Sequence, residues 1–465
     1  MTTALLLAVL LFSLPFSHAQ TSGRNPSALD DEVSLRGMIG QMLMVGYGPG
    51  TEVPDTLQAD IADRNLGGVI LLAYNVDSPQ SLRRLTGDLQ QEAEIPLFIA
   101  IDQEGGRVAR LNANNGYAST LSPAVLGERN SEWDTRDQAQ TMAGWLQDGG
   151  ININLAPVVD LNVNPNSPAI GRLNRSFSHD SSIVAAHAGW FIDEFEQRNI
   201  ITALKHFPGH GSAKDDSHLG FTDISTTWLQ EELHPYETLI AGGYSGMIMP
   251  GHLYHDKFDA EHPATLSEAT LKGKLRNELG FEGVIISDGM FMRAIQDHYG
   301  FFESVKLAIN AGIDILLYTG NFYENRSLVR QIVDYVEEQV EQGGIDRSTI
   351  EASWERIRRM KEERLSTSVP PLADARQVAE DFHLKNYPNP FNPSTVISFE
   401  LPHSKHVTLS VYDLQGRRVR ELANGGHGPG VHTYTFRADG LSSGVYIYRL
   451  DAGGSRVARK MMLLQ

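Results

Sequence analysis

The middle of the chain reads Ile200-Ile201-Thr202-Ala203-Leu204-Lys205-His206-Phe207-Pro208-Gly209-His210-Gly211. The first five residues form an apolar run of the kind found in buried strands, and the Pro and Gly residues that follow end any regular element. The loop continues to Asp216-Ser217-His218, where an Asp and a His two residues apart can hydrogen-bond and transfer protons. This stretch therefore predicts a buried strand that leads into a catalytic loop.

Seven other apolar runs alternate with amphipathic helical stretches, such as residues 181–198 and 325–342. The eight runs cover residues 42–45, 68–72, 97–101, 151–159, 200–204, 246–249, 283–286 and 313–317. Strands that alternate with helices in this number predict an α/β fold, a (β/α)8 TIM-type barrel over residues 30–365. A doubly wound sheet is the alternative, but charged and Gly-rich residues follow nearly every run and favour a ring of active-site loops.

The carboxyl-terminal part has a different pattern. Residues 366–385 are irregular, include Pro370-Pro371 and indicate a linker. Residues 386–465 alternate polar and apolar side chains in short runs separated by Gly, Asn and Pro turns, at 396–400, 407–412, 432–436, 444–450 and 456–464. This alternation predicts a small all-β, Ig-like sandwich domain.

The amino terminus indicates export, and the composition limits the class of partner. The run Ala4 to Phe12, followed by Ser17-His18-Ala19, predicts a secretory signal peptide over residues 1–19. That run is too short for a transmembrane segment, and a chain with no cysteine has neither disulfides nor a lipid-anchored cysteine. The formal net charge of −18 argues against nucleic acid as a partner. We expect a monomer.

A second candidate for catalysis lies at the end of another apolar run. Asp288 follows Ile286-Ser287 directly, so a lone carboxylate is expected at the carboxyl end of a strand, where barrel enzymes keep their catalytic groups. Taken with the segments at 205–218 and 102–108, the latter reading Asp102-Gln103-Glu104-Gly105-Gly106-Arg107-Val108, this motif resembles glycoside hydrolase family 3, in its β-N-acetylglucosaminidase branch. The resemblance covers residues 33–365.

Three segments of the last domain carry a second resemblance, to the C-terminal sorting domain of the type IX secretion system. They are residues 386–393, 444–448 and 460–464. This resemblance implies contact with the type IX secretion machinery. The protein is therefore expected to be secreted or held at the outer membrane or cell surface.

The family resemblance implies roles for individual residues. Asp288 would be the nucleophile that forms a covalent glycosyl-enzyme, and His218, oriented by Asp216, would be the general acid and base in place of a second carboxylate. Members of this branch commonly have a second Asp after the nucleophile, where this chain has Gly289. No cofactor is implied.

Further residues fall on the family's sugar-contacting positions. A carboxylate at Asp102 suits bidentate hydrogen bonding to vicinal hydroxyls. The other such positions are Arg110, Arg175, Lys205 and His206. We expect Arg107 to be structural, because Glu104-Gly105-Gly106-Arg107 can close a salt-bridged turn.

The activity implied is that of a retaining exo-β-N-acetylhexosaminidase acting on terminal β-linked N-acetylglucosamine of peptidoglycan fragments or chitooligosaccharides. A β-glucosidase or an N-acetylglucosaminide phosphorylase of the same family, and a non-catalytic surface glycan-binding protein, are the alternatives. A zinc site built from histidines such as His206, His210 and His252 is disfavoured, because the first strand lacks the His-x-His pair of metal-dependent barrel hydrolases.

Overall fold

A computed structural model describes residues 33–217, 219–365, 382, 384–401, 404–413, 417–452 and 455–464. The chain divides into two compact units, residues 1–368 and 369–465. The predicted signal peptide lies outside the described residues, and so does most of the predicted linker. Within the described part, no helix is both long and apolar enough to cross a membrane.

The first unit is built on one sheet of eight short strands. These are β1 (Leu43–Val45), β2 (Gly68–Leu71), β3 (Phe98–Ile101), β6 (Ile153–Asn154), β7 (Ile201–Phe207), β9 (Met247–Pro250), β11 (Val284–Ile285) and β12 (Leu316–Tyr318). They are hydrogen-bonded in the order β11-β9-β7-β6-β3-β2-β1-β12, and every neighbouring pair is parallel. An isolated parallel bridge joins Ile286 to Ile315. These strands overlap all eight predicted runs.

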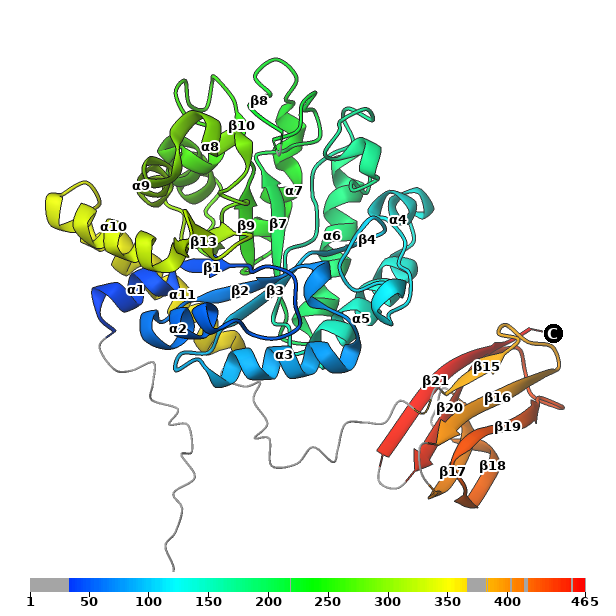
Figure 1. Ribbon diagram of the computed structural model, residues 1–465. Helices are drawn as coiled ribbons and strands as arrows, with labels where there is room; N and C mark the ends of the chain where they lie inside the picture. The colour runs from blue at the N-terminus through cyan, green and yellow to red at the C-terminus, as the bar shows by residue number, and fades with distance from the viewer. Residues whose placement is uncertain are drawn as a thin grey trace, which may run out of the picture. The chain divides into compact units, whose positions relative to one another are not determined.

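Helices surround the strands (Figure 1). The α-helices are α1 (Leu35–Gln41), α2 (Asp55–Arg64), α3 (Pro79–Gln91), α4 (Pro123–Arg129), α5 (Glu132–Asp148), α6 (Ser181–Glu196), α7 (His234–Ala241), α8 (Arg293–Tyr299), α9 (Phe301–Ala311), α10 (Leu328–Gln342) and α11 (Arg347–Leu365). Shorter 3-10 turns are η1 (Ala73–Asn75), η2 (Ala113–Asn115), η3 (Gly171–Leu173), η4 (Gln230–Leu233) and η5 (Ala264–Leu266), and η6 (Ala269–Glu278) is π-helical.

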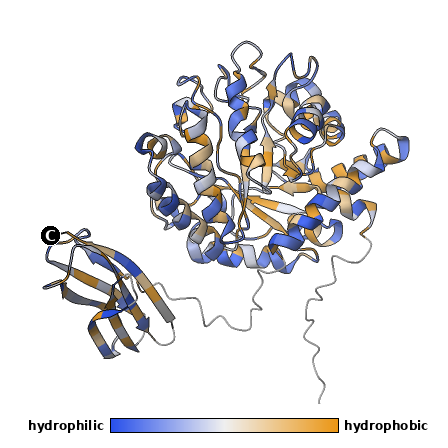
Figure 2. Ribbon diagram, turned by 180° about the vertical axis from the view of Figure 1, so that it is seen from behind, coloured by the Kyte–Doolittle hydropathy of each residue, from blue (hydrophilic) through white to orange (hydrophobic). Residues whose placement is uncertain are grey.

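Local sequence explains where these helices begin. The Ser78 hydroxyl accepts a hydrogen bond from the amide of Ser81 and so caps α3, whose first residue is Pro79. Asp180 caps α6 in the same way. The strands are coloured mainly as hydrophobic and the outer helices are mixed (Figure 2), so the core lies between sheet and helices.

Three short strand pairs lie in the described loops of this unit. They are β4 (Gln103–Gly105) with β5 (Val108–Ala109), β8 (Thr222–Asp223) with β10 (Leu253–Tyr254), and β13 (Phe322–Tyr323) with β14 (Arg326–Ser327). One boundary differs from the prediction. Strand β7 continues to Phe207, so Lys205 and His206 belong to the strand and not to the following loop.

The second unit consists of two antiparallel sheets with one shared core. Strands β15 (Lys385–Tyr387), β16 (Ser394–Leu401) and β19 (Gly430–Arg437) form one sheet, and β18 (Arg418–His427), β17 (Lys405–Tyr412), β20 (Gly444–Ala452) and β21 (Ser455–Leu463) form the other. The sequence did not predict β15 or β18. Asn424-Gly425-Gly426 consists of residue types that favour turns, yet these residues pair with β17 beside a register shift between Leu409 and Ser410.

Candidate active site

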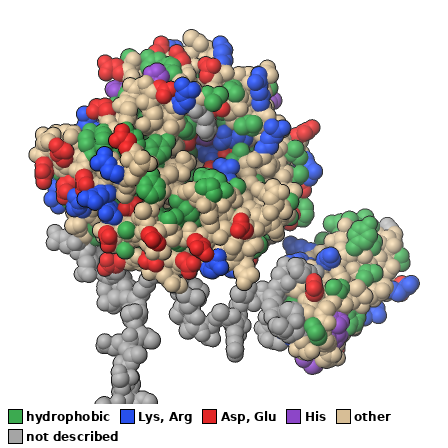
Figure 3. Space-filling model, in the orientation of Figure 1, with side chains coloured by type: hydrophobic (Ala, Val, Ile, Leu, Met, Phe, Trp, Pro, Cys, Tyr) green, Lys and Arg blue, Asp and Glu red, His purple; other side chains and the backbone are tan. Residues whose placement is uncertain are grey.

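Four of the candidate catalytic and binding residues lie at one edge of the parallel sheet. Asp102 follows β3, Lys205 and His206 lie near the end of β7, and Asp288 lies just after β11. Because the strands are parallel, their carboxyl ends meet at this edge. On the face seen in Figure 3, the first unit has a recess with Lys or Arg side chains on its floor.

Asp102 is held between two cations. Its Oδ1 accepts a hydrogen bond from Lys205 Nζ at 2.9 Å, and its Oδ2 accepts one from Arg110 at 3.0 Å. Burial alone would raise the pKa of Asp102, but Lys205 and Arg110 together hold it below the usual range. The side chains of Asp102 and Arg110 remain 17% and 29% exposed, so both can still reach a ligand.

Glu104 lies deeper and binds two cations as well. Arg175 donates to both of its oxygens, from Nε and from one terminal nitrogen, each at 2.8 Å. Lys205 Nζ lies 2.7 Å from Glu104 Oε1. Against the effect of burial, these cations lower the pKa of Glu104 below its usual range. The expected turn between Glu104 and Arg107 is therefore wrong: Arg107 is exposed, and the guanidinium on Glu104 is that of Arg175.

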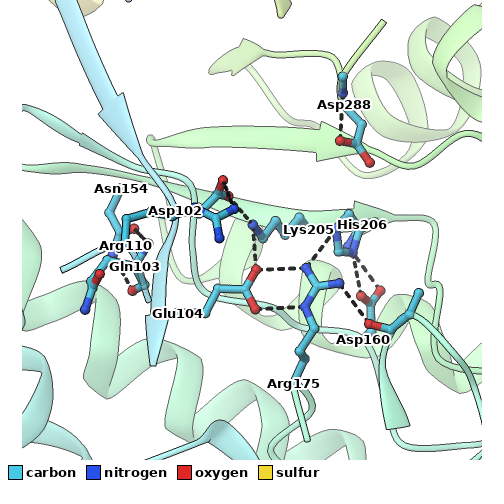
Figure 4. Close-up of polar contacts among 12 residues, drawn as sticks. Asp102, Gln103, Glu104, Arg110, Asn154, Asp160, Arg175, Lys205, His206 and Asp288 are labelled. Carbon is cyan, nitrogen blue, oxygen red and sulfur yellow. Dashed lines mark hydrogen bonds and ion pairs between the residues drawn. The ribbon is translucent and has the colours of Figure 1, made fainter. Parts of the chain in front are cut away.

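Arg175 forms most of its hydrogen bonds with neighbouring protein groups. Besides its bonds to Glu104, it donates to the carbonyl of Ala169 at 2.9 Å and lies 3.4 Å from His206 Nε2. The bonds to Glu104 and Ala169 use three of its five N–H groups, and a fourth N–H lies toward His206 Nε2. Figure 4 shows Arg175, Glu104 and Lys205 as one connected cluster.

His206 lies between Arg175 and a fully buried carboxylate. Its Nδ1 is 2.7 Å from Asp160 Oδ2, and its backbone amide donates to Asp160 Oδ1 at 3.0 Å. The same Oδ1 accepts the backbone amide of His210 at 2.8 Å. Burial, followed by the nearby His206, lowers the pKa of His210 to about 4.

The carboxyl group of Asp288 points toward Lys205 and His206 (Figure 4). Its Oδ1 accepts the backbone amide of Gly289 at 2.7 Å. A Cβ atom added at Gly289 would meet only Met292 atoms, at 3.6 and 3.7 Å, which is ordinary van der Waals contact. The backbone therefore has room for a side chain at the position where the family commonly has its second Asp.

The loop after β7 carries the other two predicted catalytic residues. Asp216 is half-buried and its carbonyl accepts the amide of Leu219 at 2.9 Å, while His218 lies outside the described residues. His210 Nε2 lies 3.3 Å from the buried Ser217 hydroxyl, and this contact connects the loop to the candidate active site.

His206, His210 and His252 serve as hydrogen-bonding groups. His252, for example, lies 2.8 Å from the Thr265 hydroxyl and 3.1 Å from the Gly289 carbonyl. Among the residues whose positions are described, no group of three or more His, Cys, Asp or Glu side chains is arranged to hold a metal ion.

The sequence reasoning missed two buried carboxylates. Asp160 follows the apolar run 151–159 directly, so the strand-end rule that found Asp102 and Asp288 would also have found it. Glu232 is fully buried against Gly209, and burial raises its pKa to about 7. No local pattern marks Glu232, because its contact with the loop after β7 arises only in the folded chain.

Comparisons with known proteins agree with the two units. Residues 34–360 match the family model described as glycosyl hydrolase family 3 N terminal domain, and residues 385–464 match the secretion system C-terminal sorting domain. Beta-hexosaminidase A of Pseudoalteromonas piscicida is 32% identical over 335 residues, which are 67% of this chain and 56% of that protein. Beta-hexosaminidase LpqI of Mycobacterium tuberculosis is 31% identical over 350 residues, 72% of this chain and 85% of that protein.

A solved structure is also similar to this chain. The glycoside hydrolase family 3 beta-N-acetylglucosaminidase from Paenibacillus sp. str. FPU-7 aligns with a TM-score of 0.68 at 31% identity, over 74% of this chain and 65% of that one. The chain thus spans somewhat less than two thirds of the length of this structure and of the Pseudoalteromonas protein.

Proposed function

Because the chain belongs to glycoside hydrolase family 3, we propose that it is a retaining exo-β-N-acetylhexosaminidase. Its substrates would be peptidoglycan fragments or chitooligosaccharides that end in β-linked N-acetylglucosamine. Relatives named beta-hexosaminidase, at 31–32% identity, support the reaction class. The observation that carries the proposal is the position of Asp288, which points toward the cluster of Asp102, Lys205 and His206.

The proposed architecture follows from the same observations. The parallel order of eight strands and the bridge between Ile286 and Ile315 favour a sheet closed into a (β/α)8 barrel over residues 30–365. The two sheets of the second unit favour an Ig-like sandwich over residues 386–465. We also propose a signal peptide at residues 1–19 and a linker at residues 366–385 between the two domains.

In the first step, an Asp288 oxygen attacks the anomeric carbon as the bond from that carbon to the leaving oxygen breaks. His218 gives its proton to that oxygen, which departs as an alcohol, and the sugar stays bound as an ester of Asp288. In the second step, water attacks the same carbon, His218 takes a proton from the water, and the Asp288 carboxylate is released. Asp216 orients His218 and increases its basicity.

The charged cluster would hold the sugar during both steps. Asp102 can accept hydrogen bonds from vicinal hydroxyls while Lys205 and Arg110 donate to the same or neighbouring oxygens. Arg175 can contribute an N–H that is not bonded to Glu104 or Ala169. Burial of Lys205 lowers its pKa, but Asp102 and Glu104 raise it by more, so Lys205 stays charged at neutral pH.

The second unit accounts for the destination of the protein. A secretion sorting domain indicates a secreted or cell-surface protein. We infer that the type IX secretion machinery is its partner and that the enzyme acts on carbohydrate outside the cell, as a monomer and without a cofactor.

Release of 4-nitrophenol tests the proposal. The N-acetyl-β-glucosaminide should be hydrolysed much faster than the β-glucoside, and added phosphate should not change the rate. Preference for the glucoside would instead support a β-glucosidase, and a sugar phosphate product would support a phosphorylase. No turnover of either substrate would contradict the proposal and favour a glycan-binding protein.

A further inference from the structure

One buried carboxylate connects the sugar-binding cluster with the catalytic loop. Asp160 is fully buried and receives three hydrogen bonds, from the His206 amide, the His206 ring and the His210 amide. The first two come from a residue in β7, and the third comes from the start of the loop that leads to Asp216. Burial raises the pKa of Asp160, but its contacts with His206 and His210 lower it by more, so the carboxylate is ionised and acts only as an acceptor.

The two nitrogens of His206 have opposite requirements. Asp160 Oδ2, at 2.7 Å, requires a proton on Nδ1. On the other side of the ring, Nε2 lies 3.4 Å from a terminal nitrogen of Arg175, and a guanidinium can only donate. A proton on Nε2 would place two N–H groups against each other in a buried cluster, which is costly. Both neighbours therefore select the same tautomer, with the proton on Nδ1.

We propose that Asp160 is a positioning residue that fixes His206 as a hydrogen-bond acceptor facing the sugar. The contact from Nε2 to Arg175 is long, so the Nε2 lone pair can accept a hydrogen bond from a substrate hydroxyl. A substrate group that meets His206 must then be a donor. Through the His210 amide, the same carboxylate holds the beginning of the loop that carries Asp216. The effect on hydrolysis rests on the proposed function, whereas the tautomer does not.

The substitution Asp160→Asn tests this with little change in shape. The Asn oxygen can still accept the amides of His206 and His210. Its NH₂ group, however, can only donate to His206 Nδ1, which moves the ring proton to Nε2, opposite Arg175. In the full-length protein labelled with ¹⁵N in histidine, two-bond ¹H–¹⁵N correlation spectra should show His206 protonated on Nδ1 in the wild type and on Nε2 in Asp160→Asn. The variant His206→Gln assigns the signal.

Kinetics provide the second readout. In Asp160→Asn, kcat/KM for the N-acetyl-β-glucosaminide should fall by on the order of 10²-fold. In a His206→Gln background, which has no tautomer to select, the same change should cost only about 3-fold or less. Asp314→Asn is the matched control. Asp314 is equally buried and binds Arg276, Arg356 and the Ile285 amide, but it precedes β12 and so lies at the opposite edge of the sheet. This control should leave the His206 signals unchanged.

Three results would overturn the inference. They are a wild-type His206 protonated on Nε2, an inverted tautomer in Asp160→Asn with activity retained, and equal kinetic losses with and without His206. The wild-type spectrum alone tests the tautomer even if Asp160→Asn fails to fold. Absence of glycosidase activity with the expected tautomer would count against the proposed function and leave the assignment of the tautomer in place.

Discussion

Glu104→Gln should destabilise the first unit strongly, although it replaces a single oxygen by nitrogen. The Glu104 side chain is 1% exposed and accepts two hydrogen bonds from Arg175 and one from Lys205, at 2.7–2.8 Å. The variant leaves both cations buried with one negative charge fewer and turns an NH₂ group toward donors. Breaking a buried pair in this way costs about 3–5 kcal/mol, a large part of the stability of a typical domain.

Tryptophan fluorescence during urea unfolding of the full chain can measure this loss. All five tryptophans lie between Trp133 and Trp354, so the signal reports on the first unit alone. Arg107→Ala is the control, because Arg107 is exposed and its loss should change the free energy of unfolding by no more than about 0.5 kcal/mol. Equal, small shifts for both variants would refute the argument that Glu104 neutralises Arg175 and Lys205.

Three further predictions concern the acid/base pair, the buried Glu232 and the second unit. His218→Ala should reduce kcat/KM by about 10²–10⁴-fold for a disaccharide but much less for a dinitrophenyl glycoside, with Asp216→Ala weaker in the same direction; equal losses for both substrates would mean that His218 does not move the proton. The folded protein keeps the Glu232 proton up to about pH 7, whereas the unfolded chain loses it near pH 4.5. The free energy of unfolding should therefore fall by about 3 kcal/mol as the pH rises between these two values. Urea titrations of Glu232→Gln should show no such fall. A chain that ends near residue 367 should keep its hydrolytic rate but fail to reach the cell surface in its native host, and loss of activity in the purified truncation would show that the second unit completes the site.

The sequence predicted the strands of the first unit well because each is a short apolar run with the local signature of a buried strand. Asp102 and Asp288 were found because both directly follow such runs. Side-chain pairing was harder to predict. Glu104 was assigned to Arg107, three residues away, yet its partner is Arg175, 71 residues further along the chain. Contacts of this kind depend on how the strands align, and a local pattern does not encode that alignment.

In the second unit, five strands were predicted from their alternation of polar and apolar residues, whereas β15 and β18 were not. Strand β18 contains Asn424-Gly425-Gly426, residues that favour turns, and is kept extended by pairing with β17. Tertiary pairing here overrides the local preference of the residues.

The proposed reaction depends on Asp288 as the nucleophile, and a mechanism-based label can identify the nucleophile. A 2-fluoro or 5-fluoro glycosyl inactivator slows the second step, so the sugar should accumulate as an ester on the nucleophile and be found by mass spectrometry of peptides. We expect the label on Asp288, and the variant Asp288→Ala should stay folded, bind no label and lose about 10⁴-fold or more in kcat. A label on any other carboxylate would show that Asp288 is not the nucleophile.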